Sequence, residues 1–414
     1  MKETALERFL RYAKIDTQSD PNSETAPTTM KQFDLANLLV KELLEMGIAD
    51  AAVDDKCYVY ATLPSNLPAG VTCPKIGFIA HVDTSPDTSG ANVKPNIIEK
   101  YMGGDIILPG DPSRIIKDDP IENPALKRCI GHKIVTSDGT TLLGADDKGG
   151  VAAIMTMVDY YLCNPEIKHG DIGIAFTPDE EVGRGADHFD VAKFGCVYAY
   201  TVDGEMPGEI NKETFSANSA TIKFFGRDIH PGFGKDIMVN SIRAMADVIA
   251  LMPKDMAPET TNERQPYIHP HKVDGTIAES RIDILLRDFD TEGLTLQKQI
   301  LEEIIAEVEP NYPKTKITLE ITESYRNMHD KLMENPIGLD YLWQAAEEAG
   351  ANPFWAPIRG GTDGSRLTFM GLPCPNIYAG GQNFHSNTEW ISIDALELSL
   401  KTLINLVEIW TKNI

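Results

Sequence analysis

The chain has 414 residues, which is long for one domain and leads us to expect two, each able to bury its own core. Its 62 acidic residues outnumber the 38 basic ones, and the formal charge of −24 has the wrong sign for binding nucleic acid or an anionic membrane surface. The sequence contains no run of the roughly 18 apolar residues that span a membrane and no apolar core of a signal peptide, and its six cysteines lack CxxC spacing. We therefore predict a cytoplasmic protein with reduced thiols.

The first elements in chain order are two amphipathic helices and two strands. Apolar residues recur at helical spacing over 6–13 and again over 30–43. A strand covers 58–63, and a second apolar strand runs directly into His81-Val-Asp83. Because side chains alternate along a strand, His81 and Asp83 lie on the same side. A lone histidine at a strand end is more often structural than a ligand, but an aspartate two residues on can orient a metal-bound imidazole.

The next segment combines turn residues with a pair of aspartates. The Pro- and Gly-rich passage 86–132 is predicted to be mostly surface loop. Residues 134–142 predict a hairpin around a Ser-Asp-Gly turn. The stretch Leu143-Gly-Ala-Asp-Asp-Lys-Gly-Gly150 then leads into an apolar helix. One aspartate, Asp146 or Asp147, is enough to cap that helix, so the second suggests a metal ligand.

Two further strands end in carboxylates. The strand 171–177 is followed by Glu180 and Glu181, and the strand 197–202 is followed by Asp203. In an α/β protein, side chains just beyond the carboxyl ends of strands point into the crevice where ligands bind. Adjacent carboxylates repel each other unless a cation lies beside them, and a divalent metal is the usual cation. Three strand ends that each present an imidazole or a carboxylate are therefore hard to explain by chance.

The pattern of elements changes after residue 212. Four strands and two helices follow in the order βα-ββ-αβ, the ferredoxin-like split arrangement. The strands cover 217–225, 266–269, 280–287 and 315–321, and the helices cover 241–252 and 294–308. The α/β pattern then resumes. We therefore predict an α/β catalytic domain built from residues 1–212 and 326–414, with a ferredoxin-like α+β lid or dimerisation domain inserted over 213–325.

These positions and a late loop supply a mixed set of imidazoles and carboxylates: His81, Asp146, Glu181, Asp203 and His385. Such a set suits one or two zinc ions or similar divalent metals. Five ligands with one shared carboxylate hold two metals about 3.5–4 Å apart, able to activate a water and polarise a carbonyl. Glu180 lies beside a ligand but is not needed as one, so it is the natural general base.

Several blocks carry a family resemblance: Ile79-Ala-His-Val-Asp-Thr-Ser-Pro86, Leu142-Leu-Gly-Ala-Asp-Asp-Lys-Gly149, Phe176-Thr-Pro-Asp-Glu-Glu-Val-Gly183, Ile229-His-Pro-Gly232 and Ile358-Arg-Gly-Gly-Thr-Asp-Gly364. They resemble the signature blocks of the peptidase T family, the tripeptide aminopeptidases among the two-domain co-catalytic zinc exopeptidases. The resemblance extends in order over essentially the whole chain. It implies that Asp146 bridges two zinc ions, with His81 and Asp203 at one and with Glu181 and His385 at the other.

The resemblance also implies roles beyond the metal ligands. Asp83 orients His81, and Glu180 is the base. His230, on the inserted domain, reaches a site to stabilise the oxyanion. It does so either across a homodimer formed through the inserted domain or by domain closure, and the sequence leaves both open.

Further matches concern the substrate. Arg287 and Arg359 match arginines that hold the substrate's C-terminal carboxylate or a peptide oxygen, since arginine can bind both oxygens at once. Asn240 matches a residue near the substrate. Glu205 stands where the family has small glycines, which leaves the side-chain preference open.

The prediction is a metal-dependent aminopeptidase that releases the N-terminal residue from short peptides, chiefly tripeptides. Acidic surroundings would receive the free α-amino group, and the arginines would receive the carboxylate. A metal-dependent amidohydrolase of N-acyl amino acids is the first alternative, and a requirement for a free amine separates the two. An inactive metal-binding scaffold is the alternative from another class; loss of the base or of a ligand would mark it, yet Glu180 and all five ligands are present.

Overall fold

The computed structural model describes residues 2–413, which divide into two compact units. The first comprises Met1–Lys212, Asp330–Ala356 and Thr362–Ile414, and the second comprises Glu213–His329 and Pro357–Gly361. The first unit is therefore discontinuous in sequence, and Arg359 belongs to the second. None of the helices in the described residues is long and apolar enough to cross a membrane.

The first unit is built on a mixed eight-stranded sheet. Its strands, in order across the sheet, are β1 (Ala52–Val53), β2 (Val59–Leu63), β8 (Ile172–Thr177), β3 (Ile76–His81), β9 (Tyr198–Gly204), β16 (Asn376–Tyr378), β10 (Glu209–Asn211) and β15 (Phe354–Trp355). The central strands β8, β3, β9 and β16 run parallel to one another, whereas β2 and β10 flank them antiparallel. The three strand ends singled out in the sequence therefore meet at one edge of the sheet.

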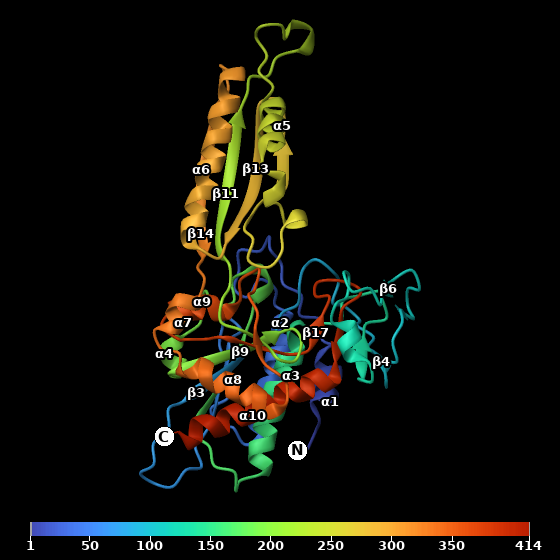
Figure 1. Ribbon diagram of the computed structural model, residues 1–414, viewed down its shortest axis with the longest axis vertical. Coiled ribbons are helices and arrows are strands. Elements are labelled where there is room, and N and C mark those ends of the chain that lie inside the picture. The colour runs from blue at the N-terminus through green and yellow to red at the C-terminus, as the bar shows by residue number, and fades with distance from the viewer. Residues whose placement is uncertain (1, 414) are drawn as a thin grey trace. The chain divides into compact units, whose positions relative to one another are not determined.

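Helices bury this sheet. They are α1 (Ala5–Tyr12), α2 (Gln32–Met46), α3 (Ala145–Cys163), α4 (Val191–Phe194), α8 (Ile337–Ala349), α9 (Asp363–Phe369) and α10 (Ile393–Lys412), with α7 (His329–Met333) at the junction of the two units in the chain. Helix α3 packs on β3 and β9 and also contacts α1 and α10 (Figure 1). Every residue of β3 and β8 is buried, as expected for strands covered on both faces.

A small sheet corrects two sequence predictions. Its strands are β17 (Gly381–Gln382), β18 (Trp390–Ser392), β7 (Ile134–Thr136) and β4 (Asn96–Ile98), and a separate pair consists of β5 (Ile106–Ile107) and β6 (Ile115–Ile116). The hairpin over 134–142 is wrong, because β7 pairs with β4 and β18 and residues 140–142 form no strand. The passage 86–132 is also more than surface loop, since Tyr101 and Leu126 share a buried core with Trp390.

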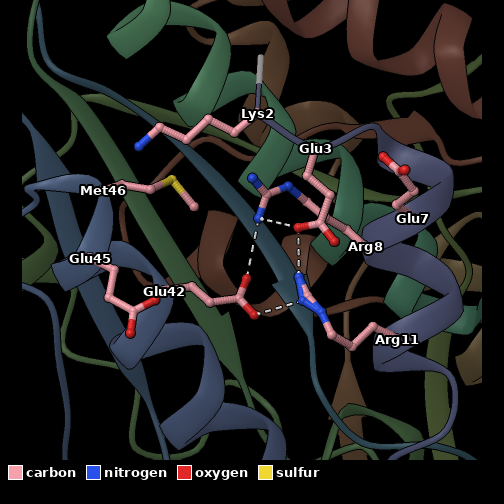
Figure 2. Close-up of a pocket in the computed structure, with 8 residues that line it drawn as sticks. All are labelled: Lys2, Glu3, Glu7, Arg8, Arg11, Glu42, Glu45 and Met46. Atoms are coloured by element: carbon pink, nitrogen blue, oxygen red, sulfur yellow. Dashed lines mark hydrogen bonds and ion pairs between the residues drawn. The ribbon is translucent and has the colours of Figure 1, made fainter.

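Helix α1 is joined to its neighbours by a network of ion pairs (Figure 2). The buried guanidinium of Arg8 lies 3.2 Å from Glu42 of α2, 3.5 Å from Glu3 and 3.6 Å from Asp159 of α3. Arg11 contacts Glu3 at 2.8 Å and Glu42 at 3.0 Å. Arg8, Arg11, Glu3 and Glu42 line a polar hollow of about 550 Å³ beside α1 and α2. The network ties the start of the chain to the helix that carries Asp146.

The second unit is a four-stranded antiparallel sheet with two helices on one face (Figure 1). Its strands, in order across the sheet, are β12 (Tyr267–Gly275), β13 (Glu279–Asp288), β11 (Ser216–Phe225) and β14 (Lys316–Tyr325), and its helices are α5 (Ser241–Leu251) and α6 (Thr291–Val308). Ala220, Ile222 and Phe224 alternate along β11 and pack into a core with residues from both helices. In chain order the strands lie 2-3-1-4 across the sheet, which is the ferredoxin-like arrangement.

Candidate metal centre and active site

All five predicted metal ligands gather around Asp146. His81 Nε2 lies 2.8 Å from Asp146 Oδ1 and 3.6 Å from Asp203 Oδ1. His385 Nε2 lies 3.4 Å from Asp146 Oδ2 and 2.7 Å from Glu181 Oε2. Asp146 therefore presents one carboxylate oxygen to each imidazole, and each imidazole also contacts a second carboxylate.

The two adjacent aspartates have different tasks. Helix α3 begins after Gly144, and both Asp146 and Asp147 have non-helical backbone angles. The Asp147 carboxylate accepts one backbone N–H from Gly150 and another from His81, each at 3.2 Å. Asp147 also lies close enough to His81 and Asp203 for the three side chains to hold a metal ion together. Both of its carboxylate oxygens, however, already accept these N–H groups. The capping interpretation therefore applies to Asp147, and Asp146 remains available as the shared ligand.

Asp83 connects two parts of the cluster. Its Oδ1 lies 3.2 Å from His81 Nδ1, the contact expected of an orienting carboxylate. The same carboxylate accepts the backbone N–H of Glu180 at 3.0 Å and that of Glu181 at 3.2 Å. Because β3 and β8 are parallel neighbours, the fully buried Asp83 positions both the His81 ring and the turn that follows β8. The second contact was not foreseen from the sequence.

The electrostatics of the cluster fit a cation. Burial raises the pKa of Glu181 to about 8, with a further contribution from the Asp146 carboxylate. Burial also raises the pKa of Asp203 to about 6 and that of Glu180 well above its usual range. Against the effect of burial, Asp146 and Glu181 raise the pKa of His385 to about 11. Asp146, Asp203 and Glu181 face the imidazoles of His81 and His385. A divalent metal bound by such a set displaces the protons of its ligands.

Glu389 is a supporting residue that sequence reasoning missed. Its Oε2 accepts the backbone N–H groups of Leu143 and Gly144, both at 2.7 Å, and its Oε1 accepts that of Asp146 at 3.1 Å. It is buried and lies four residues beyond His385, so it links the loops of two proposed ligands. The only local signal was an acidic residue immediately before a short apolar strand.

A second acidic side chain lies close in sequence to the ligands. Glu205 is exposed two residues after Asp203, and its carboxylate accepts a hydrogen bond from Gln382 at 2.8 Å. Gln382 precedes His385 by three residues. The Gln382 side chain thus fixes Glu205 between the segments that carry these two ligands.

Arg287 and Arg359 lie in the second unit, next to the same tyrosine. Arg287 is the cross-strand partner of Tyr267, and Arg359 Cζ lies 5.6 Å from the centre of the Tyr267 ring. Arg359 also donates to the carbonyls of Glu263 and Gln265 at 2.8 and 2.9 Å. The structure therefore places both arginines at one end of the sheet, with part of the Arg359 guanidinium engaged within its own unit.

His230 lies in a loop at the other end of this sheet. The loop follows Phe225, the last residue of β11, whereas Arg287 pairs near the start of that strand (Figure 1). The His230 Nδ1 accepts the backbone N–H of Gly232 at 3.1 Å. Asn240, the fourth predicted substrate residue, caps the first turn of α5 with its side chain.

Comparison with known proteins identifies the family. Residues 134–409 match the sequence profile of peptidase family M20/M25/M40. The chain belongs to this family. Within the family, it is 45% identical over 410 residues to peptidase T of Geobacillus kaustophilus, covering 99% of each chain. The predicted resemblance to peptidase T is therefore confirmed.

The family fold is also found in solved structures. A tripeptidase from Staphylococcus aureus superposes with a TM-score of 0.76 at 21% identity, covering 100% of this chain and 99% of that one. Aminopeptidase PepT from Bacillus cereus gives 0.75 at 21% identity and covers 99% of both chains. These similarities confirm the predicted α/β fold with its inserted α+β unit.

Proposed function

We propose that the chain is a metal-dependent aminopeptidase that releases the N-terminal residue from short peptides, chiefly tripeptides. The observation that carries this proposal is the central Asp146, whose two oxygens face His81 and His385 in adjacent ligand sets. A shared carboxylate between two such sets suits a pair of zinc or similar divalent ions. The names of its relatives, peptidase T and tripeptidase, support the class of substrate.

The residues of the cluster divide the chemistry among them. His81 and Asp203 would hold one metal, and Glu181 and His385 the other. Metals bound there supply a Lewis acid for the peptide carbonyl and lower the pKa of an attacking water. Glu180 takes the proton from that water and passes it to the amine released when the C–N bond breaks. Burial supports this role, because it raises the pKa of Glu180 well above its usual range and so makes the carboxylate a stronger base.

Both ends of the substrate have chemically suitable partners. The acidic edge of the sheet, including Glu205 held by Gln382, favours a free α-amino group. Arg287 and Arg359 favour the C-terminal carboxylate. Recognition of both ends would limit the length of the peptide and would disfavour N-acylated substrates.

We also propose that the working unit is a homodimer in which His230 serves the partner's catalytic centre. Arg287 pairs with Ala217 of β11, which lies eight residues before Phe225. Eight residues of strand span about 27 Å. An extended tripeptide spans only about 10 Å. One copy of the second unit therefore cannot present both His230 and the arginines to the same small substrate, whereas two copies can.

Peptide hydrolysis tests the activity. An unblocked dipeptide, tripeptide and tetrapeptide would be compared with an N-acetylated tripeptide, before and after chelation and with zinc restored. Chelator-sensitive cleavage of the free tripeptide alone is expected. Cleavage of the acetylated peptide would instead favour the amidohydrolase, and a metal-loaded protein without activity would favour the scaffold.

Mixing two inactive variants tests the dimer. His230→Ala and Glu180→Ala subunits, inactive alone, would be unfolded together and refolded as mixed dimers. A shared site predicts recovered activity, because the Glu180 of one subunit meets the His230 of the other. Absence of recovery in mixed dimers of verified composition would contradict the shared site.

The compartment follows from the cysteines. We place the protein in the cytoplasm, and this is supported by six free thiols, four of which are buried.

A further inference from the structure

The turn that carries Glu180 is attached to the N-terminal segment of the chain through Asp179. Asp179 is 3% exposed and adopts a left-handed conformation with φ of 58°. Its Oδ1 accepts hydrogen bonds from Gln32 Nε2 at 2.6 Å and from the Thr28 hydroxyl at 2.5 Å. The backbone N–H of Thr28 donates to Oδ2 at 2.8 Å. In return, Asp179 donates its own N–H to Gln32 Oε1 at 3.1 Å.

This arrangement fixes the backbone as well as the side chain. The Gln32 amide contacts Asp179 at two points, the carboxylate and the main-chain N–H, and thereby restricts rotation of the residue directly before Glu180. On its other side, the turn is held at the N–H groups of Glu180 and Glu181 by Asp83. The catalytic turn is thus held by two separate acidic side chains.

Stability alone does not explain why the contact between Gln32 and Asp179 is polar. Aspartate is one of the few non-glycine residues that adopt the left-handed region, but a buried carboxylate without a cationic partner carries a desolvation penalty. Thr28 and Gln32 lie about 150 positions away in the sequence and are themselves buried. An apolar contact between α2 and this turn would join the two segments without the desolvation penalty, so the polar contact indicates a requirement for exact placement.

We propose that Gln32 and Thr28 are positioning residues for the general base, acting through Asp179. This inference rests on the proposed role of Glu180. Residues of the N-terminal segment, which contributes no metal ligand, would set the distance and angle at which the Glu180 carboxylate meets the attacking water. Loss of this placement lowers the rate of the chemical step and leaves metal and substrate binding intact.

Gln32→Leu tests the proposal, because leucine keeps much of the volume and loses both hydrogen bonds. We expect kcat to fall about tenfold or more, with KM and metal content per subunit unchanged. Leu39→Ala is the matched control, since Leu39 is fully buried in the same helix α2 and lies seven residues, or about 10 Å of helix, beyond Gln32. The Leu39→Ala variant is expected to have a lower Tm but to keep the parent kcat when it is assayed well below that Tm.

A charge swap distinguishes positioning from stability. Gln32→Glu alone places two carboxylates together, and Asp179→Asn alone removes an acceptor, so each is expected to lower kcat. Their combination exchanges the amide and the carboxylate and is expected to recover most of the lost kcat. The proposal is overturned if Gln32→Leu keeps kcat within about twofold of the parent, if Leu39→Ala loses as much, or if the double variant is no better than either single one.

The underlying role of Glu180 has its own test. An active Glu180→Gln variant would refute the general base itself. If Glu180→Gln is inactive although it is loaded with metal, and Gln32→Leu separately keeps the parent kcat, only the positioning role is refuted.

Discussion

Glu389→Gln is expected to weaken metal binding without removing a ligand. Glutamine offers one oxygen where glutamate offers two. That oxygen can keep the N–H groups of Leu143 and Gly144, which leaves the new amide NH2 facing the N–H of Asp146. A buried N–H without an acceptor costs about 1–3 kcal/mol. The unpaired group belongs to the proposed shared ligand, and loss of such outer contacts typically lowers metal affinity about 10- to 100-fold.

A chelator titration followed by elemental analysis measures the affinity, and thermal unfolding of the metal-loaded and stripped protein measures the stability. Glu397→Gln is the matched control, because it makes the same charge change at an exposed position of α10. The control is expected to behave like the parent in both measurements. If Glu389→Gln retains metal as tightly as the parent, the link from Glu389 to Asp146 is not functional and the reasoning fails.

Three further outcomes are expected. Asp146→Ala should lower metal content at both ligand sets, and full occupancy by elemental analysis would refute the shared ligand. In the metal-free protein, the folded pKa values of Asp203 and Glu181, about 6 and about 8, lie above their ordinary values. The contribution of these two carboxyl groups to stability is therefore complete only below about pH 4, near their unfolded pKa values, and is lost as pH rises through about 6 for Asp203 and about 8 for Glu181. The rise in Tm on adding metal should therefore grow between about pH 4 and about pH 8, and a constant difference between parallel melts would contradict this. Arg8→Leu leaves the buried Asp159 without its cation, whereas Glu42 keeps its ion pair with Arg11. The change should lower the free energy of unfolding by about 3 kcal/mol in urea titrations, and a change near zero would show that the network is dispensable.

Local sequence patterns were enough to predict which edge of the first sheet holds the candidate active site. Apolar strands followed by His81, Glu180 and Asp203 needed only the rule that ligands bind at the carboxyl ends of parallel strands, and the structure makes those strands neighbours. The inserted unit was equally readable, because its strands and helices follow one another without interruption. In both cases the signal lies within a few residues of the feature that it predicts.

Contacts between distant segments could not be predicted in this way. The hairpin over 134–142 failed because β18 arrives from about 250 positions away and pairs with β7. Gln32 and Glu389 have no motif of their own, and their importance is visible only from the backbone groups that they contact. The contact between the Asp147 carboxylate and the backbone N–H of His81, 66 positions away, was likewise not foreseen.

The place of β16 in the first sheet has a consequence for biosynthesis. This strand lies between β9 and β10, although the whole second unit is translated before it. A nascent chain that has reached β14 can close the second unit, while the edge of β9 still lacks its neighbour and neither His385 nor Glu389 has been made. The set of five proposed ligands is therefore complete only after the ribosome has passed His385, between β17 and β18.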